Sequence, residues 1–447
     1  MTHNPDAALV RAIGVRRLTA SVINVTVGAG IFVLPATAAA SLGPAAPLAY
    51  LVCAVLMALI VFCFASAGSR VSLTGGLYAY IEIAFGPSVG FVCGVLYWLM
   101  ALFAVASVAS AFAASVGVLW PAAATMTGRA AVLLALFALL AYVNVRGVTP
   151  GVELVEIVTV AKLVPLLVLV GAGVWFVHAD YLKWTAVPPL SQVGRSAIVL
   201  IYAFLGVEVA LVPSGEIRDP AKTIPRAVFL ALAVTTTLYL AIQAVAQGLL
   251  GPSMASYSAA PLAEATARVL GPSGRLLVLG GATISMFGYV SGDMLGTPRV
   301  LFAFGRDGVL PAVLARVHPR FLTPHVAILT HAAVVAVLAA TSSFTQLVVI
   351  GNIAGLSLYL VAVAASYELQ RRDVHMGGVP FVMPAGPAVP ILAGAVILWL
   401  LSQATRREFA VEAAVLLLVG GFHALRRYVK MSNPQVLKST NPQILKF

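Results

Sequence analysis

The stretch Gly28-Ala29-Gly30-Ile31-Phe32 lies inside the first long apolar run of the sequence, with Pro35 just beyond it. A second run contains Phe204-Leu205-Gly206-Val207-Glu208, where a carboxylate stands among apolar residues and Pro213 follows. In hydrocarbon every backbone N–H and C=O needs a partner, so an unwound helix persists only inside protein or beside a cavity. The two stretches together predict two broken membrane helices. Either stretch alone could equally reflect close helix packing, for which glycine is common in membrane helices.

The composition around these stretches indicates a membrane protein. The chain is 61% hydrophobic and 9% charged, whereas a soluble globular domain has about 25% charged residues. A bilayer core of about 30 Å needs about 20 apolar residues per helix. Apolar runs predict twelve spans, at 18–43, 45–68, 87–117, 129–146, 150–177, 195–214, 225–250, 273–303, 324–341, 344–369, 388–404 and 408–428. The predicted fold class is therefore an all-α polytopic membrane protein.

The distribution of positive charge predicts the orientation. Most Lys and Arg residues fall in the loops on the side of the N-terminus, so the positive-inside rule places both termini in the cytoplasm of a cell-membrane protein. The same bias accounts for most of the net charge of +12 without a nucleic-acid partner. The predicted organisation is a cytoplasmic segment at 1–17 with no cleaved signal peptide, a membrane domain at 18–428 and a cytoplasmic tail at 429–447. Two short helices are expected outside the spans, at Leu77–Phe85 and Pro261–Val269.

Motifs along nearly the whole chain occur in the order of one known superfamily. After the first stretch come Thr74-Gly75-Gly76-Leu77-Tyr78-Ala79-Tyr80 and Phe85-Gly86-Pro87, and after the second come Glu216 to Arg226, Pro298-Arg299 and Arg306-Asp307-Gly308-Val309-Leu310-Pro311. The chain thereby resembles the amino acid/polyamine/organocation superfamily, whose fold is that of the bacterial leucine transporter. The resemblance implies alternating access and an inverted repeat of five plus five helices, over 18–177 and 195–369, with two added helices at 388–428.

The resemblance also implies a central substrate site at the two breaks. A broken helix offers free N–H groups to an anion and free carbonyls to a cation, as an amino acid requires. The implied positions are amides near Gly28, Ala29 and Gly30 for the substrate carboxylate and carbonyls near Thr26, Tyr202, Ala203 and Phe204 for its ammonium, with Gly206 at the second break. Tyr202 stands where some antiporters of the family place an aromatic residue over the substrate.

Three charged residues inside the predicted spans require a partner or a purpose, since a charge at mid-bilayer costs about 2.5–3.5 kcal/mol even on insertion scales. Lys162 resembles the lysine that replaces sodium in several sodium-independent relatives, although a lysine near the interface could snorkel to water. Glu208 is a candidate proton acceptor, because burial favours the neutral carboxyl, or a structural carboxylate on the unwound backbone. Asp293 could face Lys162, contact a cationic substrate or cap a local kink. His331 is expected to be a solitary neutral imidazole.

Other classes of function find less support. An embedded enzyme needs a nucleophile with a base, or a metal cluster, and the seven histidines are scattered. Cys53, Cys63 and Cys93 lie in apolar runs without ligand spacing, so we expect no metal, no cofactor and no catalysis. A channel would show a selectivity element.

The sequence therefore predicts a secondary active amino acid transporter. We expect it to be sodium-independent, and either proton-coupled or exchanging. The partners are an amino acid or amine, protons as a further candidate, and membrane lipid. A cationic amino acid or polyamine antiporter, and a non-transporting amino acid sensor on the same fold, stay open as alternatives. The substrate and the oligomeric state are not predicted.

Overall fold

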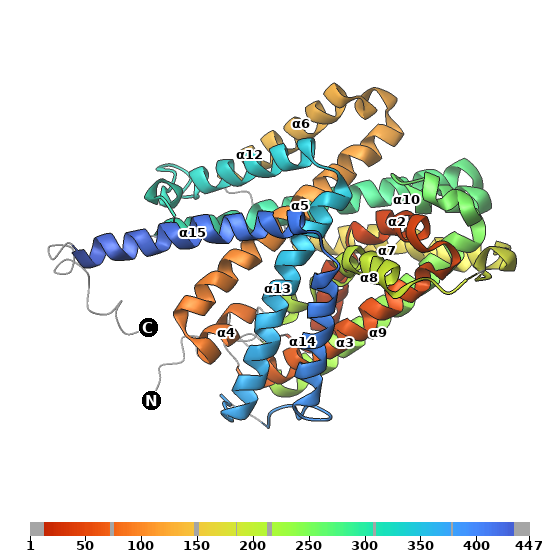
Figure 1. Ribbon diagram of the computed structural model, residues 1–447. Helices are drawn as coiled ribbons and strands as arrows, with labels where there is room; N and C mark the ends of the chain where they lie inside the picture. The colour runs from red at the N-terminus through yellow and green to blue at the C-terminus, as the bar shows by residue number, and fades with distance from the viewer. Residues whose placement is uncertain are drawn as a thin grey trace.

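The structure is a computed structural model that describes residues 13–71, 76–146, 152–184, 186–211, 217–306, 310–376 and 379–432. This part of the chain is helical, with one isolated parallel bridge between Ile13 and Ile217 (Figure 1). The helices are α1 (Val15–Thr26), α2 (Gly30–Leu42), α3 (Ala46–Arg70), α4 (Leu77–Phe85), α5 (Pro87–Leu119), α6 (Met126–Arg146), α7 (Val152–Gly173), α8 (Leu190–Leu200), α9 (Pro220–Leu250), α10 (Pro261–Gly296), α11 (Pro298–Arg306), α12 (His325–Thr341), α13 (Phe344–Arg371), α14 (Ala388–Ser402) and α15 (Arg406–Ser432).

Several of these helices are long and apolar enough to cross a bilayer. Among the described residues six stretches qualify, namely Gly30–Arg70, Pro87–Leu119, Met126–Arg146, Pro220–Ser256, Pro261–Arg306 and Phe344–Arg371. Shorter apolar helices occupy Lys162–Phe176, Leu190–Phe204 and His325–Thr341. The prediction of a polytopic α-helical membrane protein is thereby confirmed, and the number of twelve spans stays a prediction.

Helix boundaries follow glycine and proline. The stretch Gly30–Arg70 contains two helices, because the chain turns at Gly43, whose φ of 53° is readily adopted only by glycine. The short helix predicted over Leu77–Phe85 is α4. The one predicted over Pro261–Val269 is the first part of α10, which Gly271 interrupts with a φ of 63°. The last two helices, Ala388–Ser402 and Arg406–Leu418, meet at an angle of 111°.

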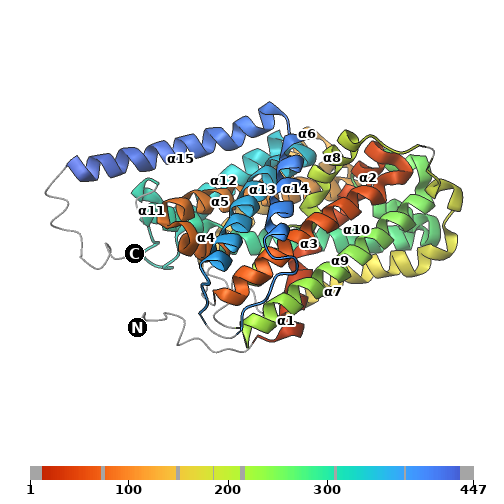
Figure 2. The ribbon, with the colours of Figure 1, turned by 60° about the horizontal axis from the view of Figure 1, so that its bottom comes forward.

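Three long helix pairs build the body of the molecule. Helix α3 packs along α9, α5 along α13, and α7 along α10 (Figures 1 and 2). Aromatic side chains fill the first interface, where the rings of Tyr50 and Tyr239 meet edge to face with centroids 6.3 Å apart. Between α3 and α13, Phe64 and Tyr359 meet in the same way at 5.2 Å. These contacts hold a rigid frame around the two broken helices.

Charged side chains anchor the ends of the helices next to the breaks. At the start of α8, Arg195 donates to both carboxylate oxygens of Glu408 on α15, at 3.0 and 2.7 Å. Ser196 and Ser41 join α8 to the end of α2 through their hydroxyls, at 2.7 Å. At the other end of the molecule, Arg218 N donates to Ile13 O at 2.9 Å. The outer halves of the two broken helices, α2 and α8, are therefore tied to each other.

Candidate functional site

The first predicted break lies between α1 and α2. Helix α1 ends at Thr26 and α2 begins at Gly30. The amide of Gly28 donates to the carbonyl of Thr26 at 2.8 Å, and no side chain caps the start of α2. Since the first amides of a helix lack an intrahelical partner, those at the start of α2 form a buried, partly positive site, with Ile31 0% exposed. Among the predicted carboxylate-binding amides, the one of Gly28 is already engaged.

The second predicted break follows α8. A 3₁₀ turn over Ile201–Phe204 leads into extended Leu205, then Gly206 with a φ of 108°, then a second 3₁₀ turn over Val207–Leu211. A methyl group added to Gly206 would lie 2.8 Å from Val25 Cγ1 on α1. Only glycine therefore suits this position, for its conformation and for the close approach of the two breaks.

Tyr239 on α9 joins the two breaks, which the sequence analysis did not anticipate. Its hydroxyl lies 2.8 Å from the carbonyl oxygen of Thr26 and 2.8 Å from that of Ala203. The ring of Phe204 packs edge to face against it, with centroids 5.3 Å apart. A phenol carries one proton, so it donates to one of these carbonyls at a time. A buried tyrosine hydroxyl usually has a partner, but nothing in the sequence identifies which partner.

Tyr202 covers the start of α2. A methyl group added to Gly30 would lie 3.0 Å from the ring of Tyr202. The hydroxyl of Tyr202 lies 2.8 Å from the hydroxyl of Ser107 on α5 and donates to the carbonyl of Ala104 at 3.3 Å. Its ring meets Phe344 at the start of α13 edge to face. The ring thus spans from the first break to the frame helices.

Lys162 on α7 points at the end of α1. Its ammonium donates to the carbonyl of Asn24, and the residue is 5% exposed. Asn24 lies in the last turn of α1, where carbonyls lack intrahelical partners and carry partial negative charge. The ammonium therefore lies where it neutralises the end of the first half-helix.

The carboxylate of Glu208 stabilises the unwound backbone of the second break. One of its carboxylate oxygens accepts from the amide of Gly206 at 2.9 Å and from the hydroxyl of Tyr359 on α13. The residue is buried. These contacts are those of a carboxylate that holds unwound backbone, one of its two predicted interpretations.

Asp293 pairs with His331, and neither of the two lies at the breaks. Asp293 Oδ2 on α10 lies 2.9 Å from His331 Nε2 on α12, and Asp293 Oδ1 accepts from the hydroxyl of Thr297 at 2.6 Å. The expectation that His331 is solitary was wrong. Asp293 contacts an imidazole, a partner that none of its three interpretations included, because the distance between helices α10 and α12 is invisible in the sequence.

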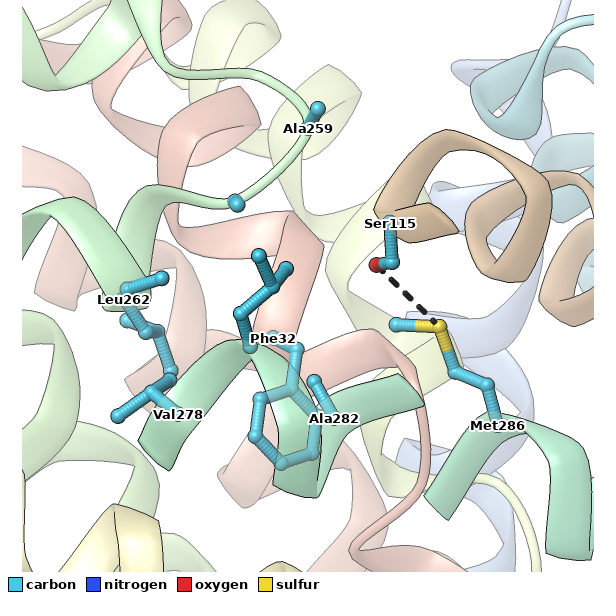
Figure 3. Close-up of a pocket in the computed structure, with 10 residues that line it drawn as sticks. Phe32, Ser115, Ala259, Leu262, Val278, Ala282 and Met286 are labelled. Atoms are coloured by element: carbon cyan, nitrogen blue, oxygen red, sulfur yellow. Dashed lines mark hydrogen bonds between the residues drawn. The ribbon is translucent and has the colours of Figure 1, made fainter. Parts of the chain in front are cut away.

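A small apolar cavity lies beyond the first break (Figure 3). Phe32 on α2, Ser115 on α5 and Ala282 and Met286 on α10 line it, and the hydroxyl of Ser115 donates to the sulfur of Met286 at 3.9 Å. Its free space is about 10 Å³, which is the lower limit for one water molecule. This cavity therefore does not hold an amino acid.

The structure brings the eight predicted substrate residues together. Those that meet at the facing breaks are Thr26, Gly28, Ala29, Gly30, Tyr202, Ala203, Phe204 and Gly206. Lys162 and Glu208 flank them, each engaged with one half-helix. Residues 72–75, 212–216 and 307–309, which carry parts of the quoted motifs, lie outside the described residues. Within the described part of the chain no group of three His, Cys, Asp or Glu could hold a metal ion.

The chain is similar to known transport proteins over most of its length. A family model described as "Amino acid permease" matches residues 13–419. Three relatives from Bacillus subtilis (strain 168) are similar over most of both chains. A methylthioribose transporter is 28% identical over 418 residues, covering 89% of each chain. A branched-chain amino acid permease is 26% identical and covers 87% of each. A serine/threonine exchanger is 27% identical over 88% of this chain and 90% of its own.

Proposed function

The chain belongs to the amino acid permease family, and on that premise we propose that it moves amino acids across the cell membrane by alternating access. The observation that carries the proposal is the pair of facing helix breaks, whose carbonyls at Thr26 and Ala203 share one hydroxyl of Tyr239. Unsatisfied backbone at membrane depth is costly, so two breaks held against each other indicate a binding site. The family and the similar relatives are transporters.

The proposed substrate position uses both ends of the breaks. The carboxylate binds the free amides at the start of α2, at Ala29 and Gly30, with Gly28 beside them. The ammonium binds the carbonyls near Thr26, Tyr202, Ala203 and Phe204. Because each carbonyl has two lone pairs and the single proton of Tyr239 serves only one of them, the remaining lone pairs are open to an ammonium. Tyr202 covers the bound molecule.

Helix contacts support the proposed inverted repeat. If the chain has twelve spans, the repeat relates span n to span n + 5. Helix α7 of the fifth span contacts α10 of the eighth, and α13 of the tenth contacts α5 of the third. Helix α1 contacts α9 in the second half, just as α8 contacts α3 in the first. The relation converts the first contact of each pair into the second, as a two-fold relation between the halves requires.

Sodium-independent transport is the proposed mode. The ammonium of Lys162 supplies a fixed cation to the carbonyl of Asn24, where a bound cation would otherwise neutralise the end of α1. The proposed role of Glu208 is gating, since its carboxylate holds the amide of Gly206 and the hydroxyl of Tyr359 together. We further propose that amino acid transport is either coupled to protons or proceeds by exchange of one amino acid for another.

A cationic substrate finds less support than a neutral one. Asp293 is the buried carboxylate that could have bound a cationic side chain, and it is already paired with His331. Neutral amino acids agree with the names of two relatives, a branched-chain permease and a serine/threonine exchanger.

A ligand panel tests the proposal. Thermal stability of the purified protein is measured with twenty L-amino acids, several polyamines and methylthioribose, each with and without sodium. A ligand at about 100 times its Kd stabilises the native state by about 2.7 kcal/mol. We expect a few neutral L-amino acids to stabilise the protein without sodium, and their D-enantiomers to serve as matched controls. Strict dependence on sodium would contradict the role of Lys162.

Saturable flux separates a carrier from a sensor. Proteoliposomes loaded with an unlabelled stabilising amino acid should take up the labelled one by counterflow. Stabilisation without any flux would support the sensor alternative, and stabilisation by no amino acid would overturn the proposed function.

A further inference from the structure

The pair of Asp293 and His331 is a buried ionisable site between α10 and α12. The imidazole of His331 is 0% exposed and the carboxylate of Asp293 is 8% exposed. Both carboxylate oxygens are engaged, one by His331 Nε2 and the other by the hydroxyl of Thr297. The second imidazole nitrogen, His331 Nδ1, is buried and has no hydrogen-bond partner.

This arrangement identifies the nitrogen of the pair that is available to a further proton. An imidazole that donates from Nε2 to the carboxylate leaves Nδ1 as an unpaired acceptor. A proton on Nδ1 would be a buried N–H donor without an acceptor, which is costly. Nδ1 therefore binds a proton only once water or a hydroxyl reaches it.

Two tyrosines are titratable neighbours of the pair. Tyr289 lies one turn before Asp293 on α10 and interacts electrostatically with Asp293, Glu208 and Tyr202. Tyr97 on α5 interacts electrostatically with Asp293 and Glu208.

Several charged or titratable residues on the neighbouring elements have contacts of their own or are exposed. On α7, the ammonium of Lys162 contacts Asn24, and on α6, Arg146 lies over the ring of Tyr142. On α11, Arg299 is exposed. The ring of His325, at the start of α12, meets that of His318 edge to face.

We propose that Asp293 and His331 form the proton-binding site that couples a proton gradient to transport. His331 Nδ1 accepts a proton from water on one side of the membrane and returns it to water on the other, while Asp293 stays ionised and stabilises the imidazolium. The inference rests on the proposed function. It assigns the proton to this pair and leaves Glu208 as a gating carboxylate.

Two assays on proteoliposomes separate proton coupling from substrate transport. Counterflow of radiolabelled L-leucine or L-threonine measures substrate transport without net proton movement. Accumulation driven by a pH gradient, with a trapped pH dye, measures coupling. Because a tenfold ratio of protons balances a tenfold ratio of solute, a gradient of about one pH unit should drive about tenfold accumulation by the wild-type protein in 1:1 symport.

We expect His331→Gln and Asp293→Asn to lose this accumulation and the dye response, while counterflow falls by less than about threefold, or about 0.65 kcal/mol. His325→Gln, at the other histidine of α12, is the matched control and should behave as wild type. Accumulation by His331→Gln equal to that of wild type would overturn the inference. The inference would also be overturned if Glu208→Gln were the single variant that lost accumulation. It would likewise be overturned if the wild-type protein exchanged substrate without moving protons.

A milder variant covers the case in which His331→Gln does not fold. Thr297→Val keeps both ionisable groups but removes one hydrogen bond to the carboxylate, so the pH midpoint of uptake should differ from that of the wild-type protein. An unmoved midpoint would overturn the inference. Absence of counterflow in the wild-type protein would instead contradict the proposed function itself.

Discussion

At the scale of single residues, the three charged residues predicted inside the spans each have a partner of a different kind. Lys162 neutralises a helix end, Glu208 holds unwound backbone, and Asp293 pairs with an imidazole. The cost of a charge at membrane depth explains why every one of them is paired. It does not determine the partner, which depends on how the helices pack.

The contact of Lys162 makes the first prediction. Lys162→Met leaves the carbonyl of Asn24 without its cation, and a hydrogen bond to a charged group contributes about 1.5–3 kcal/mol. We expect substrate affinity, measured by thermal stabilisation without sodium, to fall about tenfold or more. Lys183→Met, on an exposed lysine paired with Asp180, is the control and should leave affinity unchanged. Unaltered affinity in Lys162→Met would show that the ammonium does not support the site.

At the scale of elements, the two broken helices depend on glycine. Gly206 combines a φ of 108° with a close approach to Val25. The outer halves α2 and α8 are joined by Ser41 and Ser196. The backbone before α1 is joined to that before α9 by the hydrogen bond from Arg218 N to Ile13 O.

Substitution of Gly206 tests the second break. In Gly206→Ala the new methyl group clashes with Val25, and the strained backbone should cost about 1–3 kcal/mol. We expect a lower Tm and loss of counterflow. Gly280→Ala, inside α10 where an added methyl group meets nothing within 4 Å, should instead raise the stability by about 1 kcal/mol. A Gly206→Ala protein as stable and active as wild type would argue against a functional break.

At the scale of the whole molecule, the charge distribution and the helix order together predict the topology. Leu322 precedes α12 on the predicted cytoplasmic side and is 78% exposed. Val187 precedes α8 on the predicted outer side and is 82% exposed. Labelling of single cysteines at these two positions distinguishes the two faces.

In intact cells, a membrane-impermeant maleimide should label Val187→Cys, whereas Leu322→Cys should react only after permeabilisation, because positively charged loops are retained in the cytoplasm. The three native cysteines are buried, so the unsubstituted protein is the background control. The reverse labelling pattern would place the termini outside.

The residue order alone determined the helical membrane class, the position of both breaks and most helix boundaries. Apolar runs must be helical in a bilayer, and glycine and proline mark where they end, as at Gly43, Gly86 and Gly206. These are local properties of the chain. The tertiary structure alone decided that Tyr239 joins the breaks, that Glu208 bonds Tyr359, and that Asp293 meets His331. Such contacts join residues 36 to 213 positions apart, across helices whose rotation and register follow from the packing of many side chains at once. No single stretch carries that information, because long helices such as α3, α5 and α14 are apolar on nearly all of their faces.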